Sequence, residues 1–288
     1  MENILEVKNL NKNYKGFSLK DLNFKLERGY IMGFIGQNGA GKTTTIKLIM
    51  NLIRRNSGEI RIFGLDNIKN EKDIKQKIGF VYDETYCYED LSLVDMKNII
   101  ARFYKEWDDN TFNRYMSDFN LPKDKKIKEL SKGMKIKYSL AIALSHKAEL
   151  IVMDEPTSGL DPVFRSELLE ILSSIIQDEN KSVFFSTHIT TDLEKVADYI
   201  TFINNGKIVF SDSKDSILQK YKIVKGDNSL IDADTKKEFI GVRQNSFGFD
   251  ALTEDVPKIK TIFGDEVLFE RASLEDIMVY TVRGNRNV

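Results

Sequence analysis

A glycine-rich loop of eight residues constrains the fold of this chain more than any other feature. The loop reads Gly36-Gln37-Asn38-Gly39-Ala40-Gly41-Lys42-Thr43, and Thr44 follows it. An apolar run precedes it and a segment with helical spacing follows. In that setting backbone N–H groups can point at phosphate, the helix N-terminus adds a positive dipole, and Lys42 supplies a charge to the β and γ phosphates. We expect a phosphate-binding loop between a strand and a helix; a plain glycine turn is the alternative.

Short runs of apolar and β-branched residues alternate with helical patterns along most of the chain. The runs are 4–10, 31–35, 78–81, 150–153, 183–186 and 199–203. This alternation predicts an α/β sheet covered on both faces. The helix entered at Gly41 has apolar residues at Ile46, Ile49, Leu52 and Ile53, and their spacing predicts one stripe buried against the sheet.

Strand patterns fade between about residues 84 and 148. Segments 93–104 and 111–119 have amphipathic helical spacing there, so we expect a helical subdomain. A polar stretch at 211–216 then marks a boundary, which predicts one domain over 1–212 and a small α+β extension over 213–288.

The extension has its own local signals. Segments 239–243 and 266–269 are strand-like, and Ser273 with Asp276 matches a capping box at a helix start.

Composition excludes several classes of protein. The chain has 288 residues, of which 41% are hydrophobic, so it can bury a large core, and its net charge of -1 gives no reason to expect a nucleic-acid partner. A single cysteine and two histidines leave no intramolecular disulfide and no structural metal cluster. Because no apolar run reaches about 18 residues, we expect a chain that is not secreted and does not itself span a membrane.

Two adjacent carboxylates, Asp154 and Glu155, end the apolar run 150–153. Neighbouring residues on a strand point to opposite sides, so these two acids are expected to have different roles. The alternative is a pair of solvated acids at a strand end.

A second motif lies upstream of these acids. Residues 130–134 read Leu-Ser-Lys-Gly-Met and resemble the signature sequence of ATP-binding cassette (ABC) proteins, usually Leu-Ser-Gly-Gly-Gln, while 150–161 resembles their acidic strand and D-loop. Lys132 replaces a glycine and Met134 replaces the glutamine. The resemblance covers residues 1 to about 212. It implies a RecA-like P-loop NTPase sheet with a helical subdomain, in the ATP-binding subunit of an ABC transporter.

The resemblance also implies roles for the motif residues. Asp154 and the Thr43 hydroxyl hold Mg²⁺, Glu155 activates the attacking water as general base, and His188 contacts the γ phosphate of ATP. Tyr14 stacks on adenine, with a surface aromatic as the alternative. The other histidine, His146, is interpreted as a surface residue without chemistry.

The signature implies a second ATPase subunit. In the family's fold such a signature lies too far from its own phosphate loop, so Ser131, Lys132 and Gly133 are expected to complete the site of a partner in a head-to-tail homo- or heterodimer. Asp161 resembles the D-loop residue that crosses this interface. It also reads as a helix N-cap before Pro162, and both roles can hold at once.

Asp83 stands where most family members have a glutamine that touches Mg²⁺ and the attacking water. Aspartate is shorter and anionic, so it adds negative charge beside Glu155. We hypothesise that Lys132 offsets this charge across the dimer interface; a solvent-facing Lys132 is the alternative.

The family further implies a separate integral membrane permease, with this chain attached at the cytoplasmic face of the cell membrane. The cluster Tyr86-Cys87-Tyr88 is predicted either to help form a groove for a cytoplasmic helix of that permease or to be subdomain core. The loop that contains Asp83, segment 103–108 and the Lys-Gly-Met signature together resemble a branch of Gram-positive exporters, including those of antimicrobial or phenol-soluble-modulin peptides. The alternative function is a non-transport or regulatory ABC ATPase with weak or no hydrolysis.

Overall fold

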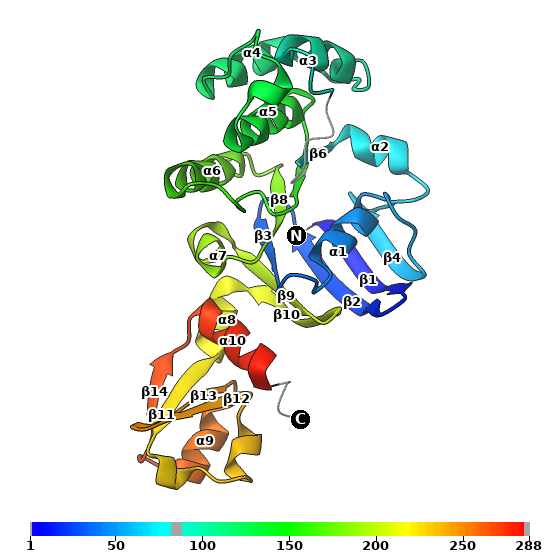
Figure 1. Cartoon of the computed structure of the whole chain (residues 1–288). Coiled ribbons are helices and arrows are strands. Elements are labelled where there is room, and N and C mark those ends of the chain that lie inside the picture. The colour runs from blue at the N-terminus through cyan, green and yellow to red at the C-terminus, as the bar shows by residue number, and fades with distance from the viewer. Residues whose placement is uncertain (1, 82–87, 285–288) are drawn as a thin grey trace. The chain divides into compact units, whose positions relative to one another are not determined.

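The computed structural model describes residues 2–81 and 88–284, and they form two compact units. The first unit ends at Ser211 and the second begins at Asp212, in the part of the ribbon coloured yellow to red (Figure 1). Each unit has its own hydrophobic core, so each is described by itself.

A six-stranded sheet forms the centre of the first unit. Its order is β10 (Lys207–Ser213), β9 (Tyr199–Asn204), β3 (Ile31–Ile35), β8 (Ser182–Thr187), β7 (Leu150–Met153) and β6 (Ile78–Val81). The pairs from β9 through β6 are parallel, and every residue of β3, β7 and β8 is buried. A continuous apolar run is what a parallel strand covered on both faces requires, so the runs 31–35, 78–81, 150–153, 183–186 and 199–203 are confirmed as strands.

The sixth run, 4–10, belongs to a different sheet from the one expected. It lies within β1 (Asn3–Tyr14), which pairs antiparallel with β2 (Phe17–Glu27) and β4 (Ser57–Ile62), and β4 pairs with β5 (Leu65–Asp66). Along β2 buried residues mostly alternate with exposed ones, the pattern of a sheet that covers a core with one face. The first unit therefore contains two sheets.

Stacked phenylalanines join these two sheets. Phe24 of β2 lies 5.5 Å from Phe34 of β3 and 5.8 Å from Phe184 of β8, measured between ring centroids. All three belong to one buried cluster, which fixes the antiparallel sheet against the strand that leads into the phosphate loop.

The helix after that loop is shorter than predicted. Helix α1 (Lys42–Ile49) buries Ile46 and Ile49, but it ends before Leu52, whose side chain is 44% exposed. Asn51 has a φ of 53°, a left-handed conformation that ends helices. The helix therefore ends before both Leu52 and Ile53, although Ile53 still packs against the core from the loop that follows.

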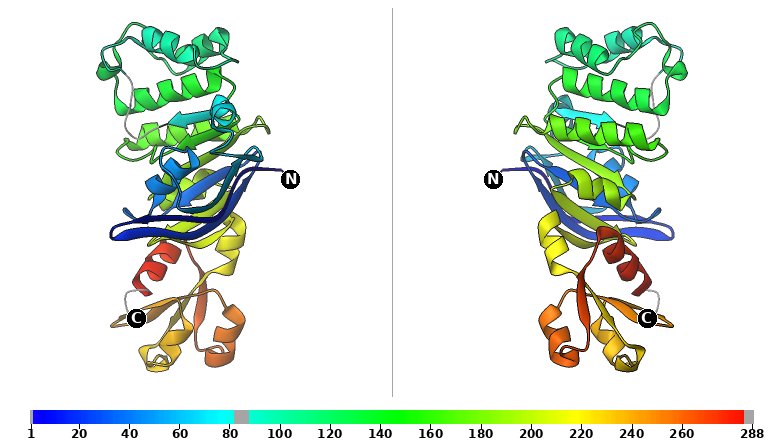
Figure 2. Two further views of the ribbon diagram at one scale, coloured as in Figure 1. Left: turned by 90° about the vertical axis from the view of Figure 1, so that its right-hand side faces the viewer. Right: turned by 90° about the vertical axis from the view of Figure 1, so that its left-hand side faces the viewer.

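Helices gather between β6 and β7 in a cluster coloured green to teal (Figure 1), and both side views show the same grouping (Figure 2). They are α3 (Leu93–Ala101), α4 (Asp109–Asp118), the short η1 (Ile127–Glu129) and α5 (Lys132–Ser145), after α2 (Glu71–Gln76). Ser92 caps α3 and Asp108 caps α4 through their side chains. Their buried side chains form a separate core, so the expected helices are confirmed.

Two further helices, α6 (Pro162–Ile175) and α7 (Thr190–Val196), follow β7 and β8. Each begins a few residues after a predicted site residue, Glu155 in one case and His188 in the other. The ends of β7 and β8 therefore place these side chains at the same edge of the sheet.

The second unit is a four-stranded antiparallel sheet with helices. The strand order is β12 (Gly241–Asn245), β13 (Gly248–Thr253), β11 (Lys222–Gly226) and β14 (Leu268–Arg271). The remaining elements are α8 (Lys214–Lys220), η2 (Asn228–Leu230), η3 (Thr235–Glu238), α9 (Val256–Phe263) and α10 (Leu274–Gly284). The capping box is confirmed, because the Ser273 hydroxyl accepts from the Asp276 N–H and the Asp276 carboxylate accepts from the Ser273 N–H.

Candidate nucleotide-binding site

The phosphate loop joins the end of β3 to the start of α1, as the sequence predicts. Gly41 precedes the helix with a φ of 115°, a conformation that strains any residue with a side chain. A Cβ on Gly36 would lie 2.4 Å from the carbonyl oxygen of Ile203, so only glycine fits there. No side chain in the described chain caps α1, which leaves its first N–H groups available to an anion.

A cavity of about 510 Å³ opens over this loop. Its lining consists of Phe17, Asn38, Gly39, Gly41, Lys42, Thr43, Thr44 and Glu155. The structure thus brings the phosphate loop and the predicted general base into one cavity.

Lys42 is buried beneath the loop, with only 5% of its surface exposed. Its ammonium donates to the carbonyl of Gly36 at 2.7 Å and lies 3.0 Å from Oε1 of Glu155. This contact joins the cation of the loop to the second of the two adjacent acids.

Glu155 lies between two charged or titratable partners. Its Oε1 faces Lys42, and its Oε2 lies 2.8 Å from Nδ1 of His188. The residue has a φ of 48°, a rare conformation for a side chain of this size. Strain of this kind persists only where surrounding contacts enforce it.

Asp154 points to other partners, as the alternation along a strand predicts. It is 8% exposed, and its Oδ1 accepts a 2.6 Å hydrogen bond from the hydroxyl of Ser186. The same hydroxyl accepts from the backbone N–H of Glu155 at 2.9 Å. One serine of β8 therefore orients both acids.

Ser186 and Phe17 are site residues that the sequence analysis missed. Ser186 is fully buried at the end of an apolar run. A hydroxyl inside such a run needs a hydrogen-bond partner, and this was the one sign in the sequence that Ser186 contacts a polar group. Phe17 lines the cavity and is paired with Tyr14 at the end of the β1–β2 hairpin. Tyr14 itself is 46% exposed, lies beside Lys12 and is not part of the cavity lining. Its adenine contact stays a prediction.

The signature residues lie outside this cavity. Ser131 caps α5 by accepting from the N–H of Met134, and Lys132 is half-buried in the first turn. A Cβ on Gly133 would lie 2.8 Å from the ring of Phe164 in α6, so glycine is required for the two helices to pack. Asp161 caps α6 by accepting from the N–H groups of Val163 and Phe164.

Asp83, Tyr86 and Cys87 lie outside the described residues. The structure therefore does not test the pairing of Asp83 with Lys132, and both remain predictions.

Known proteins resemble this chain in sequence. The family model for ABC transporter matches residues 19–158. The bacitracin transport ATP-binding protein BcrA of Bacillus licheniformis is 34% identical over 212 residues, which cover 73% of this chain and 69% of BcrA. The lantibiotic transport ATP-binding protein SrtF of Streptococcus pyogenes is 34% identical over 215 residues, 74% of this chain and 92% of SrtF. This chain belongs to the ATP-binding proteins of ABC transporters.

Solved structures agree with this membership. An ATP-binding subunit of an ABC transporter has a TM-score of 0.66 at 29% identity, over 75% of this chain and 92% of that one. The ATP-binding cassette MJ0796, bound to ADP and Pi, has a TM-score of 0.65 at 21% identity, over 73% of this chain and 98% of that one, and shows the fold. The RecA-like P-loop fold is confirmed, and the chain is an ATP-binding ATPase of the ABC family.

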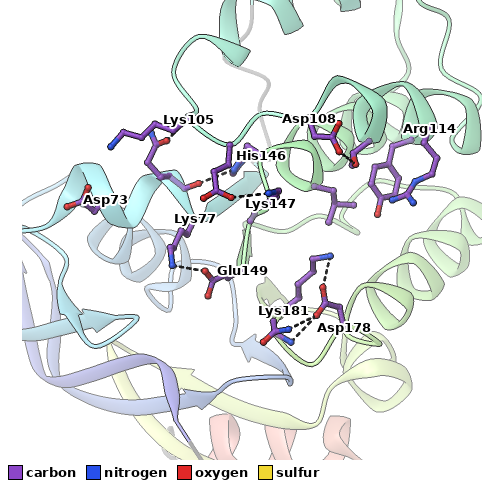
Figure 3. A pocket seen from close by; sticks show the side chains of 17 residues that line it. Asp73, Lys77, Lys105, Asp108, Arg114, His146, Lys147, Glu149, Asp178 and Lys181 are labelled. Carbon is purple, nitrogen blue, oxygen red and sulfur yellow. Dashed lines mark hydrogen bonds and ion pairs between the residues drawn. The ribbon is translucent and has the colours of Figure 1, made fainter.

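This ABC protein has a second, larger cavity away from the phosphate loop, of about 670 Å³ (Figure 3). Ion pairs occupy its rim: Lys77 with Glu149, Lys147 with Glu106, and Lys181 with Asp178. Its lining holds five acidic side chains beside five lysines and arginines, so the cavity offers no concentrated positive charge to nucleotide phosphates.

His146 borders that cavity, and the interpretation of it as a surface residue is wrong. Its side chain is 2% exposed and stacks on Tyr104 with ring centroids 3.7 Å apart. Its Nδ1 lies 3.2 Å from the carbonyl oxygen of Gln76, and burial lowers the pKa of His146 to about 4. His146 directly follows α5 and contacts the last residue of α2, a tertiary contact that the amphipathic pattern does not reveal.

No helix within residues 2–81 and 88–284 combines the length and hydropathy that crossing a bilayer requires.

Proposed function

We propose that this chain hydrolyses ATP with Glu155 as general base and His188 as its orienting partner, and that hydrolysis drives a separate membrane permease. The observation that carries the proposal is the position of Glu155, whose two carboxylate oxygens lie against Lys42 and His188. A base must be held at the reacting phosphate and oriented by a third group, and this arrangement supplies both.

ATP takes the place of an internal contact in this proposal. The phosphate loop, including Thr44, surrounds the β and γ phosphates with N–H groups. The Lys42 ammonium then leaves the Glu155 carboxylate and pairs with the phosphates instead. Glu155 is then released to face the attacking water while His188 holds its other oxygen. Because nucleotide binding breaks the contact between Lys42 and Glu155, Glu155 can act as a base only when ATP is bound.

The donors at Asp154 and Thr43 fit Mg²⁺. Asp154 is a buried carboxylate fixed by Ser186, and Thr43 supplies a hydroxyl at the first turn of α1, both of them oxygen ligands of the kind Mg²⁺ prefers. Held by these two residues, the ion would supply positive charge that stabilises the phosphate oxygens.

A second ATPase subunit completes each site. Ser131, Lys132 and Gly133 line no part of the cavity over the chain's own phosphate loop, although Ser131 and Gly133 start a helix whose N-terminus suits phosphate. In the proposed head-to-tail dimer they face the partner's nucleotide, and Asp161 lies at the interface. Residues 1–212 form this ATPase domain, and residues 213–288 are an accessory extension that adds contacts between the two subunits.

The membrane permease binds an apolar groove of about 350 Å³. Met50, Leu52, Phe80, Met96, Ile100 and Tyr104 supply most of its apolar lining. A groove of this kind accepts the apolar face of a helix, here a cytoplasmic helix of the permease. This contact holds the chain at the cytoplasmic face of the cell membrane. The names of BcrA and SrtF support export of antimicrobial compounds or peptides as the process that is powered.

Co-purification from membranes tests the transport role. Leu52 in the groove and Ile68 outside it are both 44% exposed, so Leu52→Asp and Ile68→Asp make a matched pair of variants. An integral membrane protein is expected to purify with the wild type and with Ile68→Asp but not with Leu52→Asp. Equal recovery with both variants would remove the groove from the proposal, and recovery of no membrane protein with the wild type would contradict the transport role.

A further inference from the structure

An ion pair with a buried acid joins the helix after the D-loop to the helix after His188. Nε of Arg165 in α6 lies 2.5 Å from Oδ1 of Asp192 in α7. The same guanidinium donates from its NH2 group to the hydroxyl of Thr191 at 2.8 Å. This planar, two-point contact fixes orientation as well as distance.

Burial makes this pair costly to keep. Asp192 is 1% exposed, and its Oδ2 has no hydrogen-bond partner among the described residues. Removing one member of such a pair leaves a charge buried without compensation, and even the intact pair gains little stability over apolar side chains. A buried charge with an unsatisfied oxygen requires an explanation other than stability.

The two ends of the pair supply that explanation. Arg165 belongs to the first turn of α6, where its N–H donates to the carbonyl of Asp161 at 2.9 Å. Asp192 belongs to the first turn of α7, which begins at Thr190, two residues after His188. The pair therefore connects the turn that carries Asp161 to the turn that carries His188.

We propose that Arg165 and Asp192 are positioning residues that hold His188 against Glu155 and make its position depend on Asp161. The inference rests on the proposed function, because it needs His188 to orient the base. Closure of the dimer against Asp161 shifts the start of α6, and the ion pair carries that shift to α7 and so to the His188 ring. Neither positioning residue is in the lining of the cavity over the phosphate loop.

A double-mutant cycle on ATP turnover by the full-length chain tests this proposal. Arg165→Gln is expected to lower kcat about tenfold, since small displacements of a catalytic group have effects of at least this size, while KM for ATP changes less than about twofold. In a His188→Ala background, measured under single-turnover conditions, Arg165→Gln is expected to cause no further loss. Additive losses, or a change in KM alone, would overturn the proposal.

Arg28 provides the matched control. Its guanidinium pairs with Glu149 at 2.7 Å, and its side chain is 22% exposed, compared with 27% for Arg165. Arg28→Gln is expected to leave kcat unchanged and to fold as well as Arg165→Gln. If Arg165→Gln does not fold, Asp192→Asn, which keeps the side-chain volume, replaces it in the same cycle, and a wild-type kcat in that variant overturns the proposal.

The same assays separate this inference from the proposed function. If wild type and Glu155→Gln hydrolyse ATP equally fast, the proposed function fails. If Glu155→Gln is inactive and Arg165→Gln retains full turnover, only the positioning role fails.

Discussion

Glu155 shows how single residues constrain this site. Its φ of 48° and its contacts with Lys42 and His188 fix the carboxylate before any nucleotide binds. The neighbouring acid depends on Ser186, whose hydroxyl bonds to Asp154 and to the Glu155 backbone. Both acids are thus oriented by side chains outside the acidic pair itself.

Ser186→Ala is expected to raise the Mg²⁺ concentration needed for half-maximal ATP turnover roughly tenfold, because loss of an outer-shell hydrogen bond loosens a metal ligand. Titration of turnover with Mg²⁺ measures this. Ser182 is the matched control: it is also fully buried on β8, and its hydroxyl accepts from the N–H of Gly29 at the other end of the strand. An unchanged Mg²⁺ requirement in Ser186→Ala would argue against Asp154 as a metal ligand.

His146 predicts a dependence of stability on pH. Burial lowers its pKa from 6.5 to about 4, so between these values the unfolded chain binds a proton that the folded chain excludes. The contribution of neutral His146 to the free energy of unfolding is fully present above pH 6.5. It is lost as pH falls toward about 4, and the total loss is about 3 kcal/mol. His146→Phe keeps a ring against Tyr104 and removes the titration.

Urea unfolding of both proteins at pH 7 and pH 4.5 measures the difference. The wild type is expected to lose more free energy of unfolding than His146→Phe between these values. Carboxylates titrate in both proteins and cancel in the comparison, so equal losses would show that His146 does not titrate as described.

At the scale of elements, the position of the signature residues depends on the contact between α5 and α6. Gly133 packs against Phe164, and a methyl group there would lie 2.8 Å from the ring. Gly133→Ala is expected to force the helices apart, lowering the free energy of unfolding by about 1–3 kcal/mol and reducing ATP turnover. The reduced volume of Phe164→Leu is expected to restore turnover in the double variant. If the double variant is slower than Gly133→Ala alone, packing is not the reason for this glycine.

The buried parallel strands were predictable because covering both faces demands an uninterrupted apolar run, which β3 and β7 have. The antiparallel sheet was not predicted as a second sheet, since strands such as β2 mix exposed and buried residues, and β4, the second partner of β1, lies more than forty residues along the chain. The end of α1 was mispredicted because the apolar pattern continues past Asn51, where the backbone turns left-handed.

For the site, motif spacing predicted the loop and the acidic pair, which the structure brings together. Phe17 and Ser186 enter the site only through strand pairing and tertiary packing, which no local spacing encodes. The roles of these residues in catalysis stay predictions.

For the whole molecule, the second unit is predicted to strengthen contact between two ATPase subunits. Three large apolar side chains of its described residues are exposed, Ile262 at 43%, Phe247 at 95% and Leu268 at 69%, and the last two are the most exposed. Burying either side chain in an interface would remove apolar surface from water. Phe247→Ser combined with Leu268→Ser is expected to weaken the ATP-dependent dimer at least about tenfold, as one or two such side chains contribute about 1.5–3 kcal/mol each. Sedimentation equilibrium measures the dissociation constant, and an unchanged value would contradict this role for the unit.

ATP turnover by Glu155→Gln tests the central claim most directly. The substitution keeps the volume of the side chain and its contact with His188 but removes the charge that a general base needs. The account predicts that turnover falls at least about a hundredfold while ATP still binds, because Lys42 and the phosphate loop remain. Turnover within about twofold of the wild type, with ATP bound equally well, would contradict the assignment of Glu155 as the base.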